Sequence, residues 1–157
     1  MGQTVCFRCR QSLDEKDTLR LLTRTCPSCF SLLLSARDNT LSDYLESLEI
    51  PSALLSQDHT VLLTNRHFQR IAGSQGPVRL RAGEALDCMY APMLGRCGET
   101  VACMLCWLKR SVEHTWLTGE GLRGIPMSFP HSSEKRRAFE ITTEKTGDAV
   151  LLMMTAT

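Results

Sequence analysis

The placement of cysteine constrains this chain more than any other sequence feature. All eight cysteines fall into two groups of four. The groups are Cys6, Cys9, Cys26 and Cys29, and then Cys88, Cys97, Cys103 and Cys106. Four thiolates are what one tetrahedral zinc ion or one iron–sulfur cluster requires of a protein. The sequence therefore predicts two metal centres.

Composition and charge narrow the class of protein. The hydrophobic fraction of 43% and the charged fraction of 22% are those of a soluble globular chain. A formal net charge of +1 gives no general case for binding nucleic acid or anionic membranes. Local basic clusters at 79–81, 109–110 and 135–137 leave nucleic acid as an open question, although solvated faces are the simpler interpretation.

The chain also lacks the segments that would direct it to a membrane. Its first ten residues contain no apolar run of the length a secretory signal needs, and its longest apolar runs are too short to span a bilayer. We therefore expect a cytoplasmic protein. In that reducing compartment, cysteine patterns more often bind metal than form disulfides.

Residues 1–39 are predicted to form a small zinc-binding module. The two CxxC pairs are separated by sixteen residues, a spacing found in four-cysteine zinc sites. The segment between them is too polar to form a core, so the metal must supply much of the folding energy. A CxxC that leads directly into a helix resembles a treble-clef or zinc-ribbon finger, which implies a structural role. Iron in a rubredoxin-like site is the main alternative.

Residues 40–49 are predicted to form a connecting helix with Thr40 as its N-cap and Pro51 beyond its end. The apolar residues Leu41, Tyr44, Leu45 and Leu48 recur at the spacing of a single helical stripe. Two uses of this stripe are open: packing against the following domain, or a two-helix homodimer contact through residues 41–48.

From residue 50 to 157 the pattern is that of a mixed α+β domain. Apolar runs at 52–56 and 61–64 flank a polar turn and predict a β-hairpin. Asn65 is predicted to cap a helix over 66–71. Residues 73–84 are predicted to form a loop, and residues 107–116 a helix. Three strands are expected at 122–130, 137–143 and 149–157.

This order of elements, together with the stretch from Ile50 to Ile71, resembles a PAS sensory domain. In that family the second strand ends at an asparagine that begins a helix with a buried aromatic residue, here Asn65 and Phe68. The resemblance implies a five-stranded antiparallel sheet with helices on one face around a ligand pocket. It also implies signalling through flanking helices.

A four-cysteine subgroup of PAS domains is similar over a more specific stretch. Its motif corresponds here to Gly83-Glu-Ala-Leu-Asp-Cys88, Cys97-Gly98 and Cys103-Met-Leu-Cys106. If the last four residues lie on a helix, the sulfurs of Cys103 and Cys106 face the same way. Gly98 would let the backbone approach a bulky cluster.

The downstream cysteines are open to three interpretations: an iron–sulfur cluster with four irons, a second structural zinc, or redox-active thiols with Cys103 and Cys106 as the disulfide pair. The cluster is preferred because apolar neighbours predict a water-poor shell. These neighbours are Met89, Met93, Leu94, Val101, Ala102, Met104, Leu105 and Trp107. His114 is the only histidine considered as an extra ligand, because none has a partner at ligand spacing.

These features predict a sensory or regulatory protein rather than an enzyme, since no phosphate loop, nucleophile elbow or catalytic acid pair is present. The cluster would report redox, oxygen or nitric oxide state to a protein partner. Two alternatives remain: a zinc-finger transcription or nucleic-acid-associated factor with a PAS-like dimerisation domain and two structural zincs, and an electron-transfer iron protein.

Overall fold

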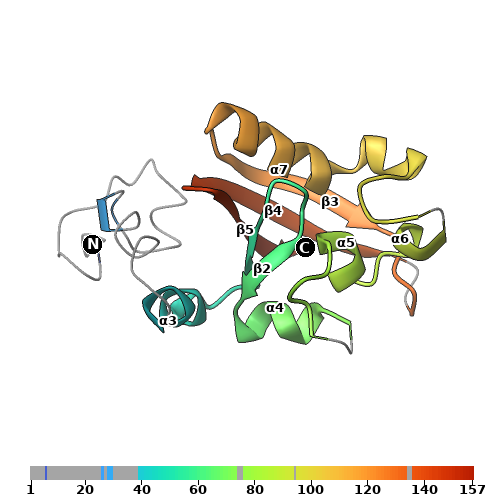
Figure 1. Ribbon diagram of the computed structural model, residues 1–157. Coiled ribbons are helices and arrows are strands. Elements are labelled where there is room, and N and C mark those ends of the chain that lie inside the picture. The colour runs from blue at the N-terminus through green and yellow to red at the C-terminus, as the bar shows by residue number, and fades with distance from the viewer. Residues whose placement is uncertain are drawn as a thin grey trace.

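A five-stranded antiparallel sheet forms the centre of the molecule (Figure 1). The computed structural model describes residues 6, 26, 28–29, 39–73, 76–93, 95–133 and 136–157. The sheet has the order β2-β1-β5-β4-β3. Its strands are β1 (Ser52–Leu55), β2 (Val61–Thr64), β3 (Leu122–Phe129), β4 (Arg137–Thr146) and β5 (Ala149–Ala156). The predicted hairpin, the three later strands and the α+β class are confirmed.

Helix α3 (Asn39–Ser47) precedes the sheet, and a series of further helices connects β2 to β3. These are α4 (Arg66–Ile71), α5 (Ala82–Ala85), α6 (Tyr90–Met93), the 3-10 helix η1 (Val101–Leu105) and α7 (Trp107–Thr118). The prediction of a continuous loop over 73–84 is wrong at its end, because α5 begins at Ala82. Glu84 lies in the first turn of α5 and stabilises the start of this helix. Its carboxylate accepts a hydrogen bond from the backbone N–H of Arg81 at 3.0 Å.

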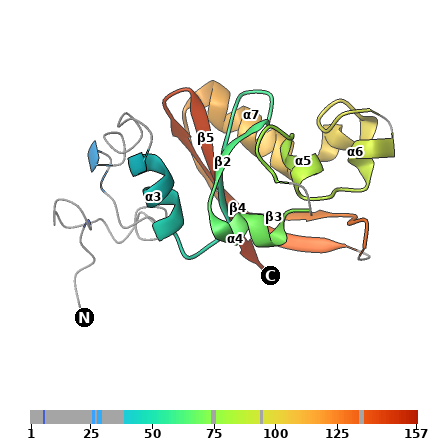
Figure 2. The ribbon, with the colours of Figure 1, turned by 60° about the horizontal axis from the view of Figure 1, so that its bottom comes forward.

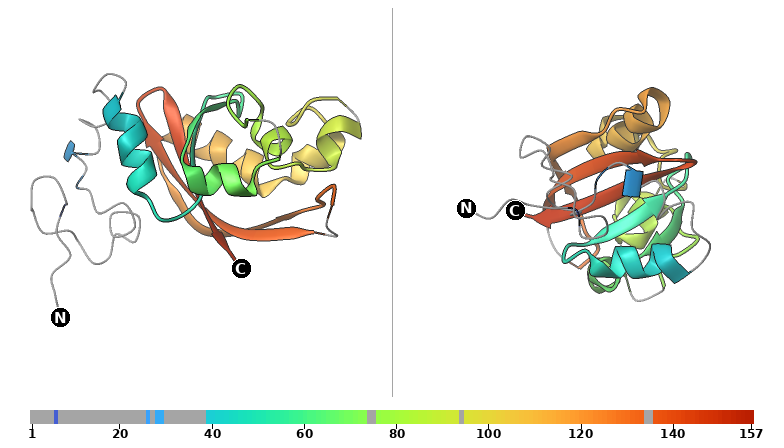
Figure 3. Two further views of the ribbon diagram at one scale, coloured as in Figure 1. Left: turned by 90° about the horizontal axis from the view of Figure 1, so that it is seen from below. Right: turned by 90° about the vertical axis from the view of Figure 1, so that its left-hand side faces the viewer.

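Alternation along the strands divides the core into two layers. On β5, Val150, Leu152 and Met154 face the larger core with α4, α5 and α7, whereas Leu151 and Met153 face α3. Figures 2 and 3 show α4, α5 and α7 gathered on one side of the strands, with α3 set apart from them. This two-sided burial follows from the period of two in a strand.

The predicted stripe of α3 is used for core packing. Tyr44, Leu45 and Leu48 are at most 3% exposed and pack on the face of the sheet that carries Leu151 and Met153. The burial of these three side chains supports the core-packing interpretation of the stripe. The prediction of Thr40 as the N-cap is wrong, because the helix begins at Asn39 and includes Thr40.

Asn65 connects α3, the sheet and α4. Its side-chain oxygen accepts the N–H of Phe68 at 2.9 Å and of Ser52 at 3.1 Å, which confirms the predicted cap. Its amide nitrogen donates to the carbonyls of Leu45, Leu48 and Ile50 at 2.8–3.1 Å. Asn65 is fully buried. Because every side-chain polar atom is paired, this residue fixes the end of α3 against the hairpin.

We expect Asn65→Ala to lower the free energy of unfolding by about 3 kcal/mol, because it leaves buried carbonyl and N–H groups without a partner. Urea denaturation of the purified chain measures the change. The control is Gln69→Ala, which removes one hydrogen bond, from the exposed Gln69 to Thr64, and should cost roughly 0.5 kcal/mol or less. Equal losses in the two variants would contradict the role assigned to Asn65.

Candidate metal centre

The four downstream cysteines reach one cavity from four local structures. Cys88 follows α5 after Asp87, whose φ of 58° turns the chain sharply. Cys97 lies in the loop after α6, Cys103 lies in η1, and Cys106 is the N-cap of α7. The expectation that Cys103 and Cys106 share one helix is therefore wrong. The CxxC spans the junction between a 3-10 helix and an α-helix.

The cavity that these cysteines line has a volume of about 290 Å³. The rest of its wall is mainly apolar and includes Leu86, Leu108, Met127 and Phe129. A water molecule in the liquid occupies roughly 30 Å³, so the space is about ten times larger than one water. It is also far larger than a single metal ion needs.

The apolar shell is only in part the one that the sequence suggested. Ala102 and Leu105 line the cavity, whereas the other described neighbours do not. Val101, Met104 and Leu105 are 69–78% exposed, and Met93 is 63% exposed. Met89 and Trp107 are also exposed, and Leu94 lies outside the described residues. The buried apolar wall of the cavity comes from Leu86 after α5, from Leu108 of α7, and from Met127 and Phe129 of β3. His114, considered as an extra ligand, is exposed and does not line the cavity.

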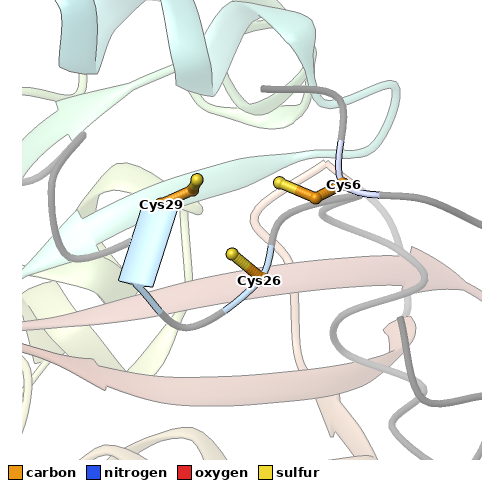
Figure 4. A group of neighbouring side chains, drawn as sticks. All are labelled: Cys6, Cys26 and Cys29. Atoms are coloured by element: carbon orange, nitrogen blue, oxygen red, sulfur yellow. The ribbon is translucent and has the colours of Figure 1, made fainter. Parts of the chain in front are cut away.

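The two groups of cysteines differ in the spacing of their sulfurs. In the first group, the Sγ atoms of Cys6, Cys26 and Cys29 lie within 4.8 Å of one another and point inward (Figure 4). Cys9, the predicted fourth ligand, lies outside the described residues. Zinc–sulfur bonds of about 2.3 Å place tetrahedral sulfurs about 3.8 Å apart. The first group thus has the spacing of a mononuclear zinc site.

The second group is spaced more widely. Among the described residues, no three of the sulfurs of Cys88, Cys97, Cys103 and Cys106 all lie within 4.8 Å of one another. Yet each of the four thiols lies close enough to the other three to influence their ionisation. A cluster binds each thiolate through a different iron and so separates the sulfurs more than one zinc ion does. Spacing and cavity volume both fit a cluster.

Backbone N–H groups face all four sulfurs. Such contacts stabilise thiolates and tune the potential of iron–sulfur clusters. Hydrogen bonds of this kind run from the N–H of Gly83 to the sulfur of Cys97 at 3.2 Å and from the N–H of Gly98 to the sulfur of Cys103 at 3.3 Å. The N–H groups concerned belong to Tyr90 and Ala91 at Cys88, Gly83 at Cys97, Gly98 and Thr100 at Cys103, and Leu108 and Lys109 at Cys106.

Two glycines are required by this geometry. A Cβ at Gly83 would lie 2.5 Å from the sulfur of Cys97, which no side chain can occupy. Gly98 has a φ of 90°, in the region that favours glycine, and this conformation directs its N–H to Cys103. The predicted close approach of the backbone at Gly98 is consistent with this arrangement, and the role of Gly83 explains the first residue of the Gly-Glu-Ala-Leu motif.

Polar side chains that sequence reasoning missed hold the cysteine loop in place. Arg81 donates to the carbonyl of Cys97 at 2.7 Å and pairs with Glu99 at 2.9 Å. Lys109 donates to the carbonyl of Gly98 at 3.0 Å. Thr100 caps η1 by accepting the N–H of Cys103. Of the polar side chains near the cysteines, only Glu84 was indicated by the sequence, because it belongs to the Gly-Glu-Ala-Leu motif.

The surroundings of the four thiols shift their pKa values in different directions. Burial raises the pKa of Cys88 and Cys106 above the usual value, and it raises the pKa of Cys97 to about 11. Burial also opposes ionisation of Cys103. There, however, the Thr100 hydroxyl, the N–H groups of Gly98 and Thr100 and the charge of Lys109 together lower the pKa. In the metal-free protein, Cys103 is the first of the four to ionise.

These shifts predict how the metal-free protein responds to alkaline pH. An unfolded cysteine ionises near pH 9, whereas folded Cys97 ionises near pH 11. The unfolded state therefore releases its protons first, and stability should fall progressively between about pH 9 and pH 11. Urea midpoints across this range test the expectation, with the Cys97→Ala variant as control. The variant keeps Cys88 and Cys106 and should therefore show a smaller fall. A fall in the wild type no larger than that in the variant would contradict the expectation.

Comparison with solved structures agrees with the fold. A Rhodobacter sphaeroides LOV protein aligns over 74% of this chain and 64% of its own, at 12% identity with a TM-score of 0.52. The PAS domain of nitrogen regulation protein NR(II) from Vibrio parahaemolyticus aligns over 76% of this chain and 100% of its own, at 10% identity and 0.51. The chain has the PAS fold. The PAS domain of an HTR-like protein from Haloarcula marismortui aligns over 74% of this chain and 94% of its own, at 11% identity and 0.50.

Sequence comparison adds no closer relationship. No protein-family model matches the chain, and no curated protein sequence is significantly similar to it. Among the described residues, every helix is too short or too polar to cross a lipid bilayer. At 10–12% identity the structural likeness concerns the PAS fold alone. What the cysteine-lined cavity does must be argued from its own chemistry.

Proposed function

We propose that this chain is a cytoplasmic sensory or regulatory protein whose PAS domain holds an iron–sulfur cluster through Cys88, Cys97, Cys103 and Cys106. It would report redox, oxygen or nitric oxide state to a protein partner, without catalysis of its own. PAS domains of known structure include parts of sensory proteins, and this supports the general role. The metal centre rests on the cavity described above.

One observation carries the proposal. Four sulfurs line a single cavity, are spaced more widely than one zinc ion holds them, and are each faced by backbone N–H groups. When bound, an iron–sulfur cluster would supply redox chemistry and sensitivity to oxygen and nitric oxide. The thiols, the N–H donors and the space left by Gly83 fit that group.

The chain's own contacts offer a route from the site to the sheet. Cys106 begins α7, and Thr115 of α7 shares a buried hydrogen bond of 2.7 Å with Thr143 of β4. Farther along, Lys145 of β4 donates to the carbonyl of Trp116 at 3.0 Å. On the opposite face, β5 packs against α3. A change in the position of η1 and α7 would thereby reach both faces of the sheet.

Hydrogen exchange tests this route. The protein would be prepared anaerobically with iron and sulfide and compared with the same sample after exposure to air. We expect faster exchange in residues 97–110 and at the end of α3. Identical exchange before and after bleaching of the visible absorption would contradict a sensory role for the site.

A structural zinc bound by Cys6, Cys26 and Cys29, with Cys9 as the predicted fourth ligand, is the second part of the proposal. The mutual distances of the three described sulfurs support it. Zinc with four thiolates has no redox chemistry, so we assign this site to folding. Removing it should leave the visible absorption of the downstream site intact.

A further inference from the structure

His59 is a buried histidine on the wall of the cysteine-lined cavity. It comes from the β1–β2 hairpin, far from the cysteines in sequence, and is 7% exposed. Its Nε2 atom has no hydrogen-bond partner among the described residues. Its φ of 66° is unusual for a residue other than glycine and turns the chain toward the cavity.

A buried imidazole nitrogen without a partner needs an explanation. Leaving such an atom unpaired destabilises the folded state, and most buried polar atoms in proteins are paired. His59 also lines an outer, more open cavity beside Lys109 and Glu113, so it stands where the two cavities meet. The four cysteines line the inner cavity together with His59, so a sulfur-rich group held there would supply such a partner.

The surroundings indicate which state of the ring is present. Burial lowers the pKa of His59, which favours the neutral imidazole with one N–H. We assign this N–H to Nε2, because Nε2 is the buried ring nitrogen that has no partner among the described residues.

His59 is not placed to share a single metal ion with the cysteines. Within the described part of the chain, it forms no group of three ligand atoms within 4.8 Å with any two of them. A hydrogen bond to a larger, sulfur-rich group requires no such spacing. Sulfide and thiolate sulfurs act as acceptors, and the N–H on Nε2 supplies the matching donor.

We propose that His59 donates a hydrogen bond from Nε2 to a sulfur of the cluster and thereby raises its reduction potential. The inference rests on the proposed function, because it requires a cluster in the cavity. Hydrogen bonds to sulfur stabilise the more negative, reduced state of a cluster. His59 would then be a positioning and tuning residue supplied by the hairpin, additional to the four ligands.

The test compares His59→Phe, which keeps a ring without nitrogen, with His59→Gln, which keeps an N–H donor. His114→Gln is the control, because His114 is exposed on α7. All proteins would be loaded anaerobically with iron and sulfide, and their midpoint potentials would be measured by spectroelectrochemical titration. Urea denaturation of the metal-free proteins would establish that each variant folds.

We expect His59→Phe to shift the reduction equilibrium about tenfold toward the oxidised state, a fall of about 59 mV for a one-electron couple. His59→Gln should recover at least half of the shift, and His114→Gln should show none. If the wild type binds a cluster and His59→Phe has the same midpoint potential, this inference is overturned and the proposed function stays intact. If His59→Phe folds but cannot be loaded, the potential of His59→Gln decides the question. A wild-type potential in His59→Gln supports a hydrogen bond from residue 59 to the cluster, and a shifted potential overturns it. A folded wild type that takes up no iron and sulfide would overturn both.

Discussion

Replacing Cys106 with serine is expected to abolish cluster binding while the fold is kept. Cys106 is the N-cap of α7, and serine is among the best residues at that position. The substitution therefore removes a thiolate without removing a helix cap. The free energy of unfolding of the metal-free variant should thus lie within about 1 kcal/mol of the wild-type value. Iron and sulfide per chain, counted after anaerobic loading, should fall to a small fraction of the wild-type value.

Two further variants make this result specific. Cys106→Ala removes any oxygen ligand that serine could offer, and it should also fail to bind the cluster. Met104→Ser changes an exposed side chain of the same η1 turn, 69% exposed, and should load normally. Full iron content in both Cys106 variants would show that this thiol is not a ligand.

Gly83→Ala should disrupt the same site without touching a ligand. The added Cβ would stand 2.5 Å from the sulfur of Cys97, so this sulfur must move and lose the N–H donated by Gly83. Overpacking of this kind costs about 1–3 kcal/mol. We expect cluster affinity to fall by roughly tenfold to a hundredfold, since about 1.4 kcal/mol corresponds to a factor of ten.

The matched control is Gly76→Ala. Gly76 has no atom within 4 Å of its virtual Cβ and no positive φ, so the same chemical change meets open space. Competition for iron against a chelator compares the two variants with wild type. Equal affinities in all three proteins would contradict the close approach of Gly83 to Cys97.

The strands were predictable because their signal is local. Alternation along 137–143 and the apolar run over 149–157 reflect the period of two in a strand, and Asn65 carries the chemistry of a helix cap. The PAS fold follows from the order of these elements. Such signals need no knowledge of which side chains meet in space.

The arrangement around the cysteines was less predictable because it depends on a short 3-10 helix and on tertiary neighbours. In a 3-10 helix, residues three apart lie above one another, so Val101 and Met104 share an outward side. Hydrophobicity alone could not show that they face solvent. His59 carried no signal either, because its relation to the cysteines exists only after the hairpin folds over the cavity.

The most direct test of the two-centre account is a count of zinc, iron and sulfide per chain in anaerobically prepared protein, with Cys26→Ser and Cys106→Ser measured beside wild type. The account predicts one zinc with about four irons and four sulfides in the wild type. It also predicts loss of zinc alone in Cys26→Ser and loss of iron and sulfide alone in Cys106→Ser. Two zinc ions and no iron in the wild type would contradict it.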